Sequence, residues 1–245
     1  MAKQSGLGQK LYVMGYDLST DVSSLSSVGY TQEVLDTTGI NVSATERITG
    51  LESSQMSVNG WFDNSAGKAH AAYLSSSKLP TGDRAVTYLI GDAITEPSFF
   101  LNAKQAEYNV ARSTGSALAT TASFASNATS AAGNGIQFGV MLDAGQTTYT
   151  SSTDGTTVDQ SSSSAAGSAA CLQFESGSSV SSFVVKVQHS TNGSSWSDLI
   201  VFTTISADTP TAEIKISSGT VNRYVRLTTT LSGTNGKCQV SFARL

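Results

Sequence analysis

The chain has 245 residues, of which 39% are hydrophobic, enough to build a core. Only 13% are charged, about half the share usual for a soluble domain. A formal net charge of -4 excludes the basic surface with which many proteins neutralise DNA phosphates. Two cysteines exclude a disulfide framework, and the absence of a long apolar run leads us to expect neither a signal peptide nor a membrane segment.

The first half of the chain is rich in strand-like segments. Met56 and Val58 alternate with Ser57 and Asn59, which is the pattern of a strand with one buried face. Strands are predicted at residues 10–16, 43–48, 55–62, 84–91 and 99–111, followed by an Ala- and Thr-rich segment at 116–124.

One segment of the first half has a helical period instead. Its small and apolar residues recur three or four positions apart, namely Ala66, Ala69, Tyr73 and Leu74. Asp63 or Asn64 is expected to cap this helix, and Pro80 to end it.

The composition changes after residue 113, where Ser, Thr, Gly and Ala dominate around one apolar strand at 136–142. We therefore predict a flexible connection at 128–133 and two domains, 1–127 and 128–245. Residues 146–167 are expected to form a long loop or a weak hairpin. Phe183, Val185 and Val187 then begin a series of short alternating strands with turns between them, which indicates an antiparallel sandwich. The predicted fold class is all-β with one short helix.

No group of residues has the composition of a catalytic centre. His70 and His189 fall in different predicted domains, and we expect His189 to bond backbone at a strand end and His70 to be solvated or between subunits. The alternation places Cys238 on the apolar face of its strand and Cys171 on the face opposite the apolar one. This favours two inert thiols over a disulfide between them. We predict no enzyme activity, no cofactor and no metal site. Asp154 and Asp159 could hold calcium weakly, but a polar loop tip is the favoured interpretation.

Aromatic residues offer one candidate binding site. Trp196 follows a turn, while Tyr224 and Arg226 lie on the polar side of one strand, an arrangement with which sandwiches stack sugars. The favoured interpretation is structural, with Trp196 covering the sandwich edge and Tyr224 filling an interface.

The first half resembles the major tail (tail tube) proteins of long-tailed bacteriophages over roughly residues 7 to 126. The similarity lies in the strand and Gly-aromatic-Asp sequence at 50–63, the helix with Lys68, His70 and Leu74, the strand at 85–92 that ends in Gly-Asp, and the segment 107–110. The second half, through 187–199 and 222–227, resembles the Ig-like or discoidin-like β-sandwich appendages of phage tail and virion proteins.

This resemblance implies a structural virion protein that forms hexameric rings, stacked into a tail tube that conducts the genome during infection. Its partners would be copies of itself, other tail proteins at the tube ends, and double-stranded DNA that passes without specific binding. The implied location is the virion tail, after assembly in the host cytoplasm. Residues 21–38 would be a loop that orders against a neighbouring ring. Two alternatives stay open: a carbohydrate-binding virion module or adhesin using Trp196, Tyr224 and Arg226, and a head decoration protein.

Overall fold

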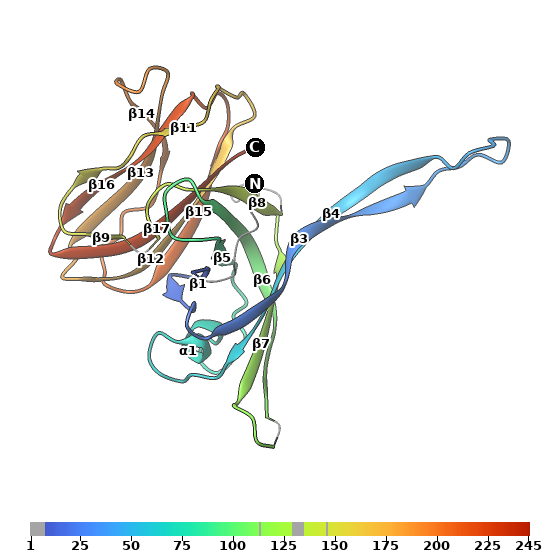
Figure 1. Cartoon of the computed structure of the whole chain (residues 1–245), viewed down its shortest axis with the longest axis horizontal. Coiled ribbons are helices and arrows are strands. Elements are labelled where there is room, and N and C mark those ends of the chain that lie inside the picture. Colours follow the sequence, from blue (N-terminus) through green and yellow to red (C-terminus); the bar gives the residue numbers. More distant parts are fainter. Residues whose placement is uncertain (1–7, 113, 129–134, 146) are drawn as a thin grey trace.

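The computed structural model describes residues 8–112, 114–128, 135–145 and 147–245, and it confirms an all-β fold with one short helix (Figure 1). The strands of the first half are β1 (Lys10–Val13), β2 (Tyr16–Asp17), β3 (Val22–Asp36), β4 (Arg47–Trp61), β5 (Arg84–Leu89), β6 (Pro97–Ala111) and β7 (Ala119–Ser126), with the helix α1 (Ala69–Tyr73). Those of the second half are β8 (Ile136–Met141), β9 (Thr147–Tyr149), β10 (Thr153–Asp154), β11 (Val158–Asp159), β12 (Ser168–Ser178), β13 (Ser182–Ser190), β14 (Ser197–Val201), β15 (Thr211–Ser217), β16 (Tyr224–Ser232) and β17 (Asn235–Arg244).

Most of the strands belong to one large sheet. Its main path runs β15-β12-β17-β8-β6-β5-β1-β2, while β3, β4, β7 and β9 branch from it. Because β12 and β15 also pack against β5, the sheet rolls up on itself into a nearly closed barrel. A second sheet of five strands, β10, β11, β13, β14 and β16, covers the outer face of β12 and β17.

The three larger apolar clusters of the described residues fill the spaces between these layers. The largest lies between the rolled sheet and the five-stranded sheet, and includes Phe174, Phe183 and Val240. The second packs α1 against β4, β6 and β7, and a smaller one fills the inside of the rolled sheet. Cys171 belongs to this inner cluster and Cys238 to the largest one, so the prediction that they occupy opposite faces is confirmed.

A buried glutamine ties the two halves of the chain together. The side-chain oxygen of Gln173 accepts the N–H of Gly15 at 2.7 Å, and its amide nitrogen donates to Ala85 O at 3.1 Å and Thr87 Oγ1 at 2.9 Å. These bonds join β12 to the β1–β2 turn and to β5. Since each partner is buried, breaking the contact would leave polar groups unsatisfied.

Hydrogen bonding also crosses the predicted domain boundary. β8 pairs with β6 on one side and with β17 on the other, so strands of both halves are continuous in one sheet. Most of the connection predicted at 128–133 lies outside the described residues. The division into 1–127 and 128–245 stays a prediction.

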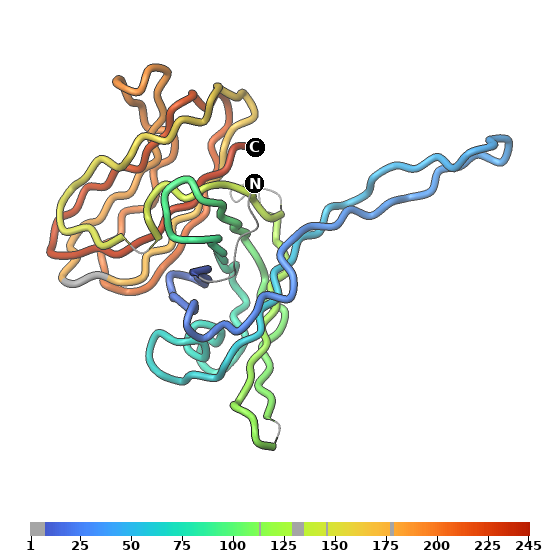
Figure 2. The backbone as a smooth tube through the Cα atoms, in the orientation of Figure 1, coloured from blue at the N-terminus to red at the C-terminus, as the bar shows by residue number. Residues whose placement is uncertain are grey.

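The prediction of a loop at 21–38 is wrong, because this segment contains the whole of the long strand β3. β3 and β4 are antiparallel partners of fifteen residues each, and only residues 55–61 of β4 pair further, with β7. Residues 31–53, here called the arm, therefore project as a two-stranded ribbon (Figure 2).

Two further predictions differ in detail from the structure. The helix exists but is short, and Asp63 does not cap it: its carboxylate accepts the N–H of Ser65 instead, while Lys68 precedes the first turn. Within the stretch 146–167, whose first residue lies outside the described part, β9 pairs with β17, and β10 and β11 pair with β16. This stretch is thus a loop with three short strands added to the sheet edges.

Candidate assembly surface and the predicted sugar site

The structure places Trp196 and Arg226 in direct contact. The Arg226 guanidinium lies 4.4 Å from the centre of the Trp196 ring, a cation–π geometry. The same guanidinium donates to Gln188 Oε1 from Nε at 3.0 Å and from Nη2 at 2.9 Å, and it pairs with Asp154 at 3.0 Å. The donors expected to meet a sugar are therefore engaged within the chain.

Tyr224 lies on the same face of the five-stranded sheet, two residues before Arg226 on β16. The Arg223 guanidinium stands 5.0 Å from its ring centre, and the turn at Gly193 lies against the ring as well. Arg223 in turn makes bonds of 2.7 and 2.6 Å to Asp159, and these bonds lower the pKa of that carboxyl to about 2. Sugar binding by Trp196, Tyr224 and Arg226 stays a prediction.

The histidines occupy structural positions. Asn222 donates its backbone N–H to Nδ1 of His189 at 3.3 Å, which confirms the predicted backbone bond at a strand end. His70 is half-buried rather than solvated: its Nδ1 lies 3.0 Å from the Tyr108 hydroxyl, and its ring packs beside Phe62. It holds α1 against β6.

Asp154 and Asp159, the weak calcium candidates, bind Arg226 and Arg223 instead. In the part of the chain that the structure describes, no three His, Cys, Asp or Glu side chains gather as metal ligands. Within the same residues, no helix is long and apolar enough to cross a membrane.

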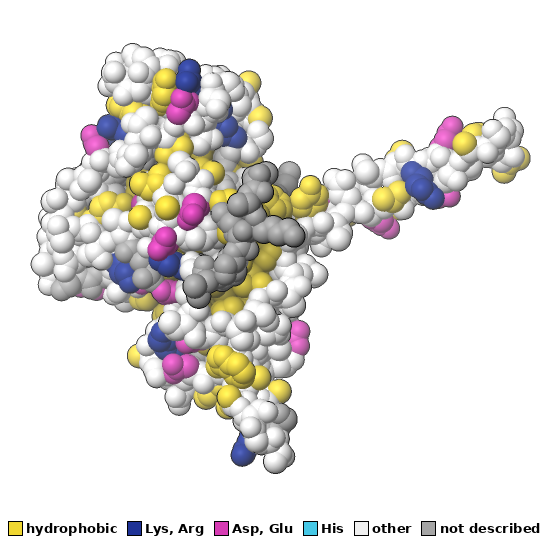
Figure 3. Space-filling model, viewed as in Figure 1, with side chains coloured by type: hydrophobic (Ala, Val, Ile, Leu, Met, Phe, Trp, Pro, Cys, Tyr) yellow, Lys and Arg dark blue, Asp and Glu magenta, His cyan; other side chains and the backbone are white. Residues whose placement is uncertain are grey.

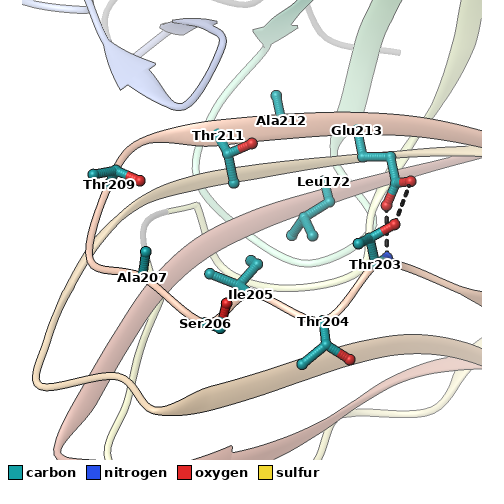
Figure 4. A pocket seen from close by; sticks show the side chains of 10 residues that line it. All are labelled: Leu172, Thr203, Thr204, Ile205, Ser206, Ala207, Thr209, Thr211, Ala212 and Glu213. Carbon is teal, nitrogen blue, oxygen red and sulfur yellow. Dashed lines mark hydrogen bonds between the residues drawn. The ribbon is translucent and has the colours of Figure 1, made fainter.

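A pocket of about 330 Å³ lies between β12, β15 and the loop that follows β14 (Figure 4). Leu172 and Ile205 supply aliphatic surface, and threonine hydroxyls surround it. Glu213 accepts bonds from the N–H and the hydroxyl of Thr203, at 2.7 and 2.9 Å. The pocket thus presents hydroxyls and aliphatic groups, while the carboxylate in its wall is already engaged.

The strongest functional feature is a pair of open strand edges. β3, β4, β7 and β6 lie side by side, each antiparallel to the next. Among the described residues, no strand pairs with the outer edge of β3, and β5 covers β6 only as far as Ala103. This four-stranded segment therefore ends in unpaired backbone on both sides, which is a template for pairing with another chain.

The two faces of the four-stranded segment differ sharply. One face carries Met56, Val58 and Phe124, and α1 covers it. The other face, here called the uncovered face, has no described element packed on it and carries amide and hydroxyl groups: Ser57 and Asn59 from β4, Thr121 and Ser123 from β7, and Asn109 from β6. Its charged members are Glu107, which accepts a bond from Asn109, and Lys104, which pairs with Asp83 at 2.7 Å.

The arm presents apolar side chains to water. Figure 3 shows hydrophobic side chains at intervals along the arm, out to its tip. They are Val34, Leu35, Ile40, Val42, Ile48 and Leu51, and Ile40 at the tip is fully exposed. A lone two-stranded ribbon is marginal in water, and exposed apolar surface of this extent marks an interaction site. The sequence contains these residues, but no local pattern shows that they lie together on a projecting ribbon.

No family model and no curated protein matches the sequence. Among solved structures, the chain is similar to a component of the virion of a native gene transfer agent particle, with 13% identity, a TM-score of 0.41, and 52% of this chain and 96% of that chain covered. A component of the tail of an empty gene transfer agent particle with C6 symmetry has 16% identity, a TM-score of 0.40 and the same coverage. The Dit protein of phage SPP1, described as a hub adsorption apparatus, has 10% identity and a TM-score of 0.36, with 97% and 99% covered.

These structural neighbours are components of phage tails and of virion-like particles. Because their TM-scores are below 0.5, we build the proposal that follows on the strands of this chain.

Proposed function

We propose that this chain is a structural virion protein of a long-tailed phage, and that six copies close side by side into a ring of the tail tube. The observation that carries the proposal is the four-stranded segment with two open edges. A ring of identical copies joins the β6 edge of one copy to the β3 edge of the next, which leaves no edge unpaired.

Strand direction supports this closure. β3 is antiparallel to β4, β4 to β7 and β7 to β6, so β3 and β6 run in opposite directions. When copies are related by rotation about an axis, the β6 of one copy lies antiparallel to the β3 of its neighbour. The closed barrel is then antiparallel throughout, the pairing that needs no crossover between neighbours.

Local irregularities supply the curvature that a barrel needs. The register of β3 shifts against β4 between Val22 and Ser24 and again between Leu25 and Ser27, and that of β6 shifts against β7 between Gln105 and Glu107. Bulges of this kind bend a strand and increase its twist. They occur in both strands that carry the open edges.

The uncovered face would line the channel, since α1 blocks the other one. A channel surface of Ser, Thr and Asn offers DNA phosphates few cations to bind, so little counterion release would hold the genome in place. The second half of the chain, packed on the rolled sheet, would then lie outside the tube. Such a protein would act by shape and self-assembly, with DNA passing through without specific contacts.

Electron microscopy of the purified full-length chain over a range of concentrations tests this function. We expect closed sixfold rings with a central channel. Single cysteines at Ser24 or Ser27 on β3 and at Glu107 or Asn109 on β6 should cross-link neighbouring copies when a β3 variant is mixed with a β6 variant. A cysteine at Thr230, on the five-stranded sheet, is the control that should not cross-link. A chain that stays monomeric at every concentration, or that cross-links β3 to β3, would contradict the proposal.

A further inference from the structure

Exposed apolar residues gather at both ends of β4. At one end the arm carries its six aliphatic side chains. At the other end Trp61 closes the strand with 47% of its surface exposed. With a rise of about 3.3 Å per residue, the fifteen residues of β4 separate these two ends by about 46 Å. The arm and Trp61 of one copy therefore cannot touch.

The Trp61 end forms a small apolar surface of its own. Trp61 is the cross-strand partner of Ala119, and Ala119 is the partner of Ala111, so the three side chains lie on one face of adjacent strands. This face is the uncovered one. Arg112, also exposed, follows Ala111 directly and adds a positive charge at this end of the segment.

We infer that the arm of one copy binds the surface formed by Trp61, Ala119 and Ala111 on a second copy of this chain, displaced along the strand direction. Charge favours this occupant. Beside its aliphatic residues the arm carries four carboxylates and one cation, namely Glu33, Asp36, Glu46, Glu52 and Arg47. An acidic ribbon with aliphatic side chains complements an aromatic surface beside Arg112.

The geometry also determines the kind of assembly. The two patches are different surfaces at the two ends of β4, so their contact is heterologous and leaves a free arm and a free Trp61 end on every stack. Each added copy can receive another, and the assembly grows along one direction. This inference rests on the proposed function, because it identifies the contact by which rings would stack.

The test uses the full-length chain with either Ile40→Ser on the arm or Trp61→Ala at the receiving end. Ile40 is fully exposed, so its replacement leaves the fold intact even if Trp61→Ala does not. We expect both variants to form rings normally and to need about tenfold more protein to stack, which is about 1.4 kcal/mol for each ring-to-ring association. Val201→Ser, an exposed aliphatic outside both patches, is the matched control and should stack like the parent chain.

Cross-linking identifies the contact directly. A chain with Ile40→Cys, mixed with a chain with Trp61→Cys, should form a disulfide between copies. Cys171 and Cys238 will not interfere, because both are buried and burial raises the pKa of their thiols. Cross-links between two Ile40→Cys chains, or stacking that neither variant weakens, would overturn the inference while leaving ring formation intact. Failure of the parent chain to form rings at all would instead reject the proposed function.

Discussion

At the scale of single residues, Asp143 is the clearest source of pH dependence. It follows β8 and is buried, with Oδ1 accepting the N–H of Val240 at 3.0 Å and Oδ2 accepting the Tyr149 hydroxyl at 3.4 Å. Burial raises its pKa to about 7, and neither Lys10 nor these bonds offset that cost. The folded chain thus keeps a proton, between about pH 4 and pH 7, that the unfolded chain releases.

The sign of the effect on stability follows from this difference. The favourable contribution of Asp143 is fully present below about pH 4 and is lost as the pH rises to about 7, a change of about 4 kcal/mol at about 1.4 kcal/mol per pKa unit. We expect Asp143→Asn, which keeps an acceptor for Val240, to flatten the decrease in the urea midpoint between pH 4 and 7. Asp36→Asn on the arm should leave that slope unchanged. An Asp143→Asn protein with the parent slope would contradict the prediction.

A side chain at position 15, where the chain has Gly15, would have no room. It adopts a φ of 83°, and a Cβ there would stand 2.2 Å from the carbonyl oxygen of Phe174 and 2.6 Å from the backbone nitrogen of Thr211. Both are backbone atoms, the first on β12 and the second at the start of β15. We expect Gly15→Ala to lower the free energy of unfolding by about 3 kcal/mol or more, measured in urea.

Gly219→Ala is the matched control for that measurement. Gly219 has a similar φ of 92°, but a Cβ would meet nothing within 4 Å. Its replacement should cost only the backbone strain of about 1 kcal/mol. Equal losses for the two alanine variants would mean that the contact with β12 and β15 is unimportant.

At the scale of elements, the arm contributes surface and no core. None of its residues is buried. Joining Thr31 to Ser53, which face each other across β3 and β4, through an Asn-Gly turn would remove residues 32–52. We expect the urea midpoint to change little and rings to form, while stacking is lost. Light scattering and electron microscopy measure both outcomes, and a large loss of stability would show that the arm supports the fold.

A strand can be predicted from the sequence where its residues alternate between a buried and an exposed face. Met56 and Val58 sit on a strand with one buried face, so the alternation was readable. In β3 the half-buried residues Val22, Leu25 and Val28 are three apart, because bulges insert an extra residue at each step. Ser23 and Ser26, beside these bulges, donate their hydroxyls to the carbonyls of Asn59 and Ser57. Beyond Tyr30 both faces are exposed, so no alternation is left to detect.

The candidate surface was predictable only in outline. A surface with few charges and many hydroxyls buries few ions when copies associate, and the sheet face with Ser57 and Thr121 has that composition. The open edges depend on which strands meet, and one of the pairings that sets this order joins strands far apart in sequence, β4 with β7. No local pattern encodes such pairing or where it stops. The role of Gln173 could not be identified for the same reason, because Gly15, Ala85 and Thr87, which it ties to β12, lie more than eighty residues away.

At the scale of the whole molecule, the two halves act as one unit. β8 pairs with β6 of the first half and with β17 of the second, and Gln173 connects β12 to the β1–β2 turn and to β5. A ring built through β3 and β6 would therefore hold the five-stranded sheet at a fixed place on its outside. Any partner of that sheet would be presented at regular intervals around the tube.

The charge of the uncovered face should determine whether an assembled tube retains DNA. Ser57→Lys together with Thr121→Lys adds two cations per copy to that face, on neighbouring strands that pair within the segment. We expect assembled tubes of this variant to retain double-stranded DNA at low salt and to release it steeply as salt rises, because each phosphate contact releases a counterion. The parent tubes should retain none.

Ser197→Lys with Thr230→Lys is the control, because it adds the same charge to the exposed five-stranded sheet. This variant should bind DNA only on the outside, where a nuclease can digest it. Nuclease-protected DNA in the Ser57 and Thr121 variant would place this face in the channel, and DNA equally sensitive in both variants would place it elsewhere.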